Sequence, residues 1–157
     1  MQITLLAIGK TDRIELERLI AVYDKRLSRY VKFEMVSIPD IKNAKNLSED
    51  QQREREGELL LARVQATDSL YLLDERGIQY SSVDFSDFLQ KRMNSGIKNL
   101  VLALGGPYGF SPQVHARAQG KIALSKMTFS HQMVRLFLVE QLYRAFTILR
   151  NEPYHHR

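Results

Sequence analysis

The residues whose types and spacing could do chemistry gather in three short segments of the second half of the chain. The first covers residues 100–112, LVLALGGPYGFSP, where an apolar run leads directly into Gly105 and Gly106. Ligands of open parallel sheets bind beyond the carboxyl ends of the strands, and glycines there let the backbone approach a ligand closely. A tight connection that binds nothing would give the same pattern. The spacing matches neither GxGxxG nor GxxxxGK[ST], which disfavours a phosphate cradle.

The second segment covers residues 123–131, ALSKMTFSH, where another apolar strand end turns polar before the last helical pattern. Ser130 is the predicted N-cap of that helix, because serine oxygens accept hydrogen bonds from the first free amides. His131 then lies at the helix N-terminus, whose dipole disfavours the charged imidazolium. A neutral histidine can act as a base, although a histidine in this position is often structural.

The third segment is the tail, residues 151–157, NEPYHHR. Pro153 ends the helix, and an aromatic ring, two imidazoles and a guanidinium group follow it. Such groups suit an unpaired RNA base and its phosphates, although a frayed terminus is the ordinary alternative. A metal site on His155 and His156 is not expected, because adjacent side chains diverge and no third ligand set is evident.

Other chemistries find less support in the sequence. The motifs GxSxG and HExxH are absent, and Asp74 and Glu75 are the only carboxylate pair at a strand end, where they could equally be turn residues. The absence of cysteine excludes disulfides, thiolate zinc sites and cysteine nucleophiles, and it fits a reducing compartment.

The sequence favours a cytoplasmic protein without a membrane span. The first apolar run, residues 3–8, is short and leads into charged residues instead of a small-residue cleavage site, so it is a poor export signal. The longest apolar stretch, residues 134–149, is interrupted by Arg135, Glu140 and Arg144, which a membrane helix would not tolerate well.

The net charge of +5 is unevenly distributed. Residues 1–112 carry 16 basic and 16 acidic side chains, whereas residues 113–157 carry seven basic and two acidic ones. A basic region attracts phosphate-rich partners such as nucleic acid. A basic protein without such a partner is the alternative, and charge alone does not decide between them.

Alternating apolar runs and helical patterns predict one α/β domain, residues 1–157, with a mostly parallel sheet of five to six strands and helices on both faces. The expected strands are residues 3–8, 33–38, 70–73, 100–104 and 121–124. Helices are expected over about residues 14–30, after Ser48, after Ser82 and over about residues 132–150. The segment 40–46 is expected to be a mobile loop.

Periodicity also predicts which helix residues are buried. The first helix is expected to bury a stripe made of Leu16, Leu19, Ile20, Tyr23, Leu27 and Tyr30, and the second to bury Leu59, Leu60 and Val64. The last helix is apolar around most of its circumference. It must therefore lie centrally or pack against a second copy, and we favour a homodimer.

Taken together, these segments resemble the RlmH family, the ribosomal RNA large-subunit methyltransferases H. The strings that carry the resemblance are GGPYG, LSKMTFSHQMVR and VEQLYRAFTILRNEPYHH, supported by ITLLAIGK near the start and LLDERG at residues 72–77. The resemblance covers essentially the whole chain. It implies a SPOUT (α/β-knot) fold with a deep C-terminal trefoil knot, which general fold rules would not predict.

The resemblance also implies an activity, a cofactor and partners. Members of the family are homodimers that methylate N3 of a pseudouridine in 23S rRNA on assembled ribosomes. They use S-adenosylmethionine as methyl donor and no metal. The family's donor pocket falls on nine positions of this chain: Leu73, Gly105, Gly106, Leu124, Ser125, Lys126, Met127, Thr128 and Phe129.

Catalytic positions of the family fall on His131, Tyr154 and His155. The chain ends His-His-Arg where other members often end His-Arg or His-Lys, so either His156 or Arg157 could supply the terminal cation. His131 could remove the N3 proton, or the basic tail could lower the pKa of the acceptor. The sequence does not say which subunit of a dimer supplies each tail.

Three other functions stay open at this point. The first is a SPOUT methyltransferase acting on another RNA, such as tRNA. The second is a non-catalytic RNA- or ribosome-binding protein that keeps the fold, which would bind the donor without transferring methyl. The third is a flavodoxin-like nucleotide binder, which would bind flavin or phosphate and not S-adenosylmethionine.

Overall fold

A computed structural model describes residues 1–156 and shows a five-stranded sheet in the order β2-β1-β4-β3-β5. All neighbouring strands are parallel, which confirms the predicted α/β class. The strands are β1 (Gln2–Ile8), β2 (Lys32–Ile38), β3 (Ser69–Gln79), β4 (Asn99–Leu104) and β5 (Gly120–Ala123). Consecutive parallel strands need crossover connections, and helices supply them.

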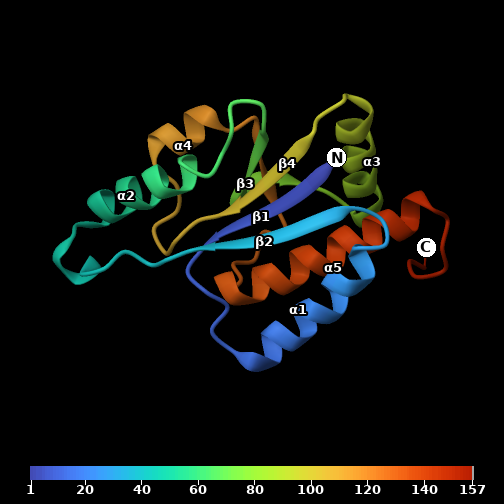
Figure 1. Cartoon of the computed structure of the whole chain (residues 1–157), viewed down its shortest axis with the longest axis horizontal. Coiled ribbons are helices and arrows are strands. Elements are labelled where there is room, and N and C mark those ends of the chain that lie inside the picture. The colour runs from blue at the N-terminus through green and yellow to red at the C-terminus, as the bar shows by residue number, and fades with distance from the viewer. Residues whose placement is uncertain (157) are drawn as a thin grey trace.

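Helices cover both faces of the sheet (Figure 1). On one face lie α1 (Ile14–Leu27), α3 (Ser82–Asn94) and α5 (His131–Leu149), and on the other lie α2 (Glu49–Leu61) and α4 (Pro112–Arg117). Side chains of β1 alternate between the two layers: Leu5 belongs to the core under α1, α3 and α5, and Leu6 to the core under α2 and α4. This alternation is the period of two expected for a strand that is buried on both faces.

Helix α5 lies between α1 and α3 and contacts both. Leu138, Leu142 and Ala145 are completely buried in its own chain, while the ring of Phe137 is 37% exposed. Its apolar character is thus explained in large part by a central position, the first of the two alternatives that the sequence left open. Within residues 1–156, no helix is long and apolar enough to cross a membrane.

Several expectations about single elements are wrong. Leu19 is 48% exposed and Leu59 is 43% exposed, because the buried stripes of α1 and α2 are narrower than their apolar patterns. The short helix α4 was not predicted at all. Residues 40–46 do connect β2 to α2 as a loop, and Ala44–Asn46 within it form a 3-10 helix.

Strand β3 continues six residues beyond its expected end. Its first part pairs with β5 at Leu73, and after a register shift Ile78 pairs with the same β5 residue, Ile122. Gly77 makes the close approach possible, because a Cβ atom there would lie 2.6 Å from backbone atoms of Lys121 and Ile122. The extension forms one wall of the cavity described below.

Replacing Gly77 with alanine is expected to destabilise the fold by about 3 kcal/mol, because backbone cannot move aside as a side-chain end can. For a chain of this length the melting temperature should fall by about 10 °C. Gly96→Ala is the matched control, since Gly96 has a positive φ of 77° but open space around it and should lose about 1 kcal/mol. Equal melting temperatures for the two variants would contradict the prediction.

Candidate functional site

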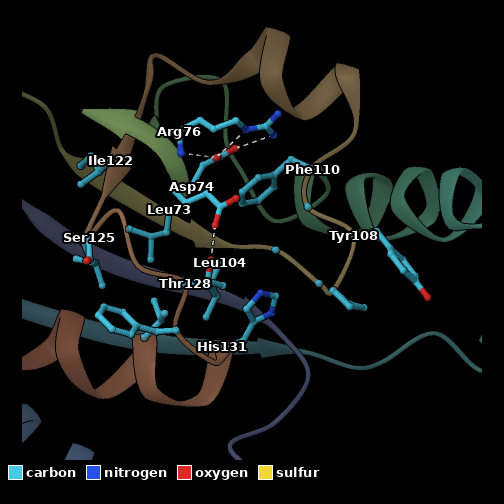
Figure 2. Close-up of a pocket in the computed structure, with 18 of the residues that line it drawn as sticks. Leu73, Asp74, Arg76, Leu104, Tyr108, Phe110, Ile122, Ser125, Thr128 and His131 are labelled. Carbon is cyan, nitrogen blue, oxygen red and sulfur yellow. Dashed lines mark hydrogen bonds and ion pairs between the residues drawn. The ribbon is translucent and has the colours of Figure 1, made fainter. Parts of the chain in front are cut away.

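A cavity of about 450 Å³ lies at the carboxyl ends of β4, β3 and β5 (Figure 2). This volume is in the range of small-molecule sites. Apolar side chains from the strand ends form its floor: Leu73, Leu104, Ile122 and Leu124. The rest of its wall comes from residues 105–110, the loop between β5 and α5, the start of α5, and the extension of β3.

The glycine turn, residues 105–109, brings bare backbone to the cavity. It is closed by a hydrogen bond from the Gly109 amide to the Gly106 carbonyl, 3.2 Å long. Gly109 has a φ of 78°, which other residues rarely adopt. A Cβ atom at Gly105 would lie 3.2 Å from the Phe110 ring and 3.3 Å from the Gly109 carbonyl oxygen. The turn therefore depends on glycine for its shape and for access to its backbone.

The loop between β5 and α5 forms the opposite wall. The Ser125 hydroxyl accepts a hydrogen bond from the Met127 amide (2.9 Å), and the Thr128 hydroxyl donates one to the Glu75 carboxylate (2.7 Å). The ring of Phe129 packs edge-on against Phe137 of α5, with centroids 5.1 Å apart. These contacts tie the loop to β3 on one side and to α5 on the other.

Three polar residues of the cavity, Asp74, Glu75 and Arg76, come from the β3 extension. The Asp74 carboxylate accepts hydrogen bonds from the Arg76 amide (2.9 Å) and side chain (3.3 Å). Burial opposes its ionisation, but these bonds and the Arg76 charge together hold the pKa of Asp74 below its ordinary value. Asp74 thus lines the cavity from within β3, at its register shift, and is not the turn residue that the sequence also allowed.

His131 is the first residue of α5 and lies on the cavity wall. The Ser130 hydroxyl accepts a hydrogen bond from the Met133 amide, which confirms the predicted N-cap. Burial, and then the charge of Arg135 one turn further along α5, lower the pKa of His131. Arg135 is only 1% exposed and donates a 3.0 Å hydrogen bond to the Ile8 carbonyl, so its charge is fixed beneath the histidine. Both effects favour the neutral imidazole.

The tail residues Tyr154 and His155 fold back and pack against the second half of α5. The Tyr154 hydroxyl donates to Glu140 (2.9 Å), and the Arg144 guanidinium lies 4.6 Å from the centre of its ring. Arg144 also approaches the Nδ1 atom of His155 at 3.4 Å. The chain turns back after α5, so the Tyr154 hydroxyl meets Glu140, the tenth residue of the helix, about 14 Å along the helix axis from His131 at 1.5 Å per residue.

The structure brings together most of the nine positions that the resemblance assigns to a donor pocket, but it separates the three positions that the resemblance assigns to catalysis. Eight of the nine donor-pocket positions line the cavity, and Lys126 is the exception. His131 joins them, whereas Tyr154 and His155 of the same chain do not. Arg157, one of the two possible terminal cations, lies outside the described residues. Within residues 1–156, no group of three or more metal-ligating side chains is assembled.

Several cavity residues were missed by the sequence analysis, including Tyr108, Phe110, Ile122 and Val134. Tyr108 and Phe110 flank Gly109 in the segment 100–112, so their proximity to the glycines could have predicted that they line the cavity. Val134 lies one helical turn after Ser130 and faces the cavity beside His131, which helix periodicity could have suggested.

The comparison with known proteins agrees with this architecture. Residues 1–155 match the family model described as "Predicted SPOUT methyltransferase". The chain is 66% identical over its full length and that of the relative to a protein of Flavobacterium johnsoniae named ribosomal RNA large subunit methyltransferase H. Proteins of the same name from Christiangramia forsetii (63%, all of both chains) and Parabacteroides distasonis (57%, 99% of both chains) are also similar. The chain, with its parallel sheet and its cavity at three strand ends, belongs to the SPOUT methyltransferase family.

Proposed function

We propose that this chain is an S-adenosylmethionine-dependent methyltransferase that modifies N3 of a pseudouridine in 23S rRNA, acting on assembled ribosomes in the cytoplasm. The observation that carries the proposal is the cavity itself, which is surrounded by eight of the nine positions that the resemblance assigns to the donor. The names of the relatives, all ribosomal RNA large subunit methyltransferases H, support the choice of substrate.

The residues of the cavity fit the proposed donor in size, polarity and charge. Its apolar floor suits an adenine ring, and the exposed backbone of the glycine turn offers hydrogen-bonding groups to the ring edge and ribose. The carboxylates of Asp74 and Glu75 suit a ligand that carries a sulfonium and an ammonium group. The donor has no phosphate, in keeping with the lack of a phosphate-binding motif. When bound, S-adenosylmethionine supplies an electrophilic methyl group whose transfer to nitrogen leaves a neutral thioether.

For the acceptor side we propose that His131 removes the N3 proton. Its side chain lies on the cavity wall, and burial together with Arg135 keeps it neutral. A neutral imidazole within reach of the acceptor can take the proton as the new nitrogen–carbon bond forms. In the competing route the basic tail lowers the pKa of the acceptor. That route requires no proton transfer to His131.

We further propose a homodimer in which Tyr154 and His155 of the partner subunit complete each cavity. The support is geometric: Tyr154 and His155 are held against Glu140, Tyr143 and Arg144, none of which lines the cavity. The tail of one chain would therefore have to leave these contacts to reach its own His131. The half-buried side of α5 that carries Phe137 is the face we assign to the dimer contact. The family membership also leads us to infer the trefoil knot, which involves the segment following β5.

The experiment that tests the proposed reaction uses labelled S-adenosylmethionine and ribosomes from a strain that lacks this enzyme. Label recovered in N3-methylpseudouridine of 23S rRNA is the expected result. Ribosomes already carrying the modification are the matched control and should accept no label. Donor binding without transfer to any ribosomal RNA would contradict the proposal and favour a non-catalytic binding protein.

A further inference from the structure

Behind the glycine turn lies a buried acidic residue that the proposed reaction does not use. Glu56 of α2 is only 4% exposed. Its Oε1 atom accepts a hydrogen bond from Gln52 (3.0 Å), while Oε2 has no hydrogen-bond partner among residues 1–156. Burying a carboxyl group with an unsatisfied oxygen costs free energy that an apolar side chain of similar size would not cost. Such departures from ordinary core chemistry concentrate at functional sites.

The unsatisfied Oε2 atom of Glu56 points toward Gly106, on the side of the glycine turn that faces away from the cavity. A Cβ atom built on Gly106 would lie 2.3 Å from Glu56 Oε2 and 2.6 Å from Oε1. One Cα hydrogen of Gly106 therefore points at the carboxyl group, a contact that only glycine permits and that weak Cα–H···O attraction favours. Gly106 lines the cavity with the rest of its backbone.

The next residue of α2, Gly57, packs against the same segment five residues further on, at Ser111. A Cβ atom on Gly57 would lie 2.4 Å from the Ser111 hydroxyl oxygen, which caps α4 by accepting a hydrogen bond from Val114. Glu56 and Gly57 of α2 thus contact Gly106 and Ser111, which lie near the two ends of the segment that connects β4 to α4. This arrangement leaves the turn little freedom to move away from the cavity.

We infer that Glu56 is a positioning residue of the donor pocket: its buried carboxyl group stands behind Gly106 and holds the glycine turn in the shape that lines the cavity. No cationic side chain pairs with Glu56 among the described residues, and Asp40, the charged neighbour that acts on it, has the same sign. Burial, and then the charge of Asp40, raise the pKa of Glu56, which is consistent with the geometry.

Amide exchange at Gly109 tests the inference without any ligand, because that amide closes the turn onto Gly106. Glu56→Ala is expected to raise the Gly109 exchange rate about tenfold while the amides of β4 keep their protection. Glu56→Gln, which keeps the size and the acceptor oxygen of the side chain, should stay within about twofold of the wild type. Glu54→Ala, an exposed acid on the same helix, is the matched control and should change nothing.

Calorimetric binding of S-adenosylmethionine to the same variants gives the second readout, and this one rests on the proposed function. Glu56→Ala should weaken binding about tenfold, and Glu56→Gln should restore it. A wild-type chain that does not bind S-adenosylmethionine would overturn the proposed function. The amide-exchange test of Glu56 would still be valid, because it needs no ligand. A folded Glu56→Ala variant with wild-type exchange and affinity would overturn the inference alone, as would a Glu56→Gln variant as impaired as Glu56→Ala.

A double variant keeps the test informative if Glu56→Ala alone is too unstable to study. Gly106→Ala should lower both the melting temperature and the affinity, because the new methyl group collides with the carboxyl group. Adding Glu56→Ala to Gly106→Ala is expected to raise both again, since the collision is removed and the methyl group fills part of the space. A double variant worse than Gly106→Ala would show that the two residues do not meet as inferred.

Discussion

Replacing His131 with alanine is expected to slow methyl transfer about 100-fold or more, the usual contribution of a positioned general base. Binding of S-adenosylmethionine should change by less than about threefold, because the apolar floor and the glycine turn remain. Single-turnover transfer to unmodified ribosomes, with the donor affinity measured separately, distinguishes the two effects. Transfer by the variant near the wild-type rate would exclude His131 as the base and favour the tail.

The pH dependence gives the same hypothesis a second test. The base acts in its neutral form, and the pKa of His131 is lowered by burial and by Arg135. The wild-type rate should therefore hold down to a lower pH than an ordinary histidine would allow, and fall below that. The residual rate of His131→Ala should instead rise about tenfold per pH unit, because the acceptor must ionise unaided. Parallel profiles for both proteins would contradict the assignment.

Deleting residues 153–157 is expected to abolish most transfer, about 100-fold, while leaving donor binding unchanged. The tail contacts Glu140, Tyr143 and Arg144, none of which lines the cavity, so its loss should not disturb the cavity of its own chain. The matched control is Glu152→Gln, which changes the residue before the deletion and its contact with Tyr30 but keeps Tyr154 and His155. Wild-type transfer by the deletion variant would refute a catalytic role for the tail.

Mixing the two inactive variants tests which subunit supplies the tail. In a mixed dimer, the tail of the His131→Ala subunit can reach the intact His131 of the truncated subunit. Random exchange makes half of the dimers mixed, each with one intact site of two, so about a quarter of wild-type activity should return. Tails that act in their own subunit would restore none. Exchange can be confirmed by differently tagged chains.

The sequence predicted the sheet well because strands buried on both faces leave a strong pattern. Residues 100–104 are apolar at every position, and they form the centre of the sheet as β4. The prediction of a site at strand ends followed from the glycines after β4 and the polar turn after β5. Both segments meet in one cavity because parallel strands end at the same edge.

What the sequence could not show depends on contacts between distant residues. The extension of β3 past Leu73 exists because Gly77 lets it approach β5, and residues 74–76 read locally as a turn. Glu56 sits in a stretch of charged residues, so its burial behind Gly106 had no local signal. The low pKa of His131 was expected from the helix dipole, but its main causes are burial and Arg135, which α5 brings beneath it.

The docking of the tail has an entropic consequence for RNA binding. Tyr154 is held at its hydroxyl by Glu140 and across its ring by Arg144, and its ring packs 4.6 Å from that of Tyr143. Immobilising a side chain on binding costs roughly 0.5–1.5 kcal/mol. The side chain of Tyr154 is already ordered by these contacts before RNA binds. A protein of 157 residues has little surface with which to offset such losses. Its terminal aromatic group is therefore preorganised, held against the side of a helix.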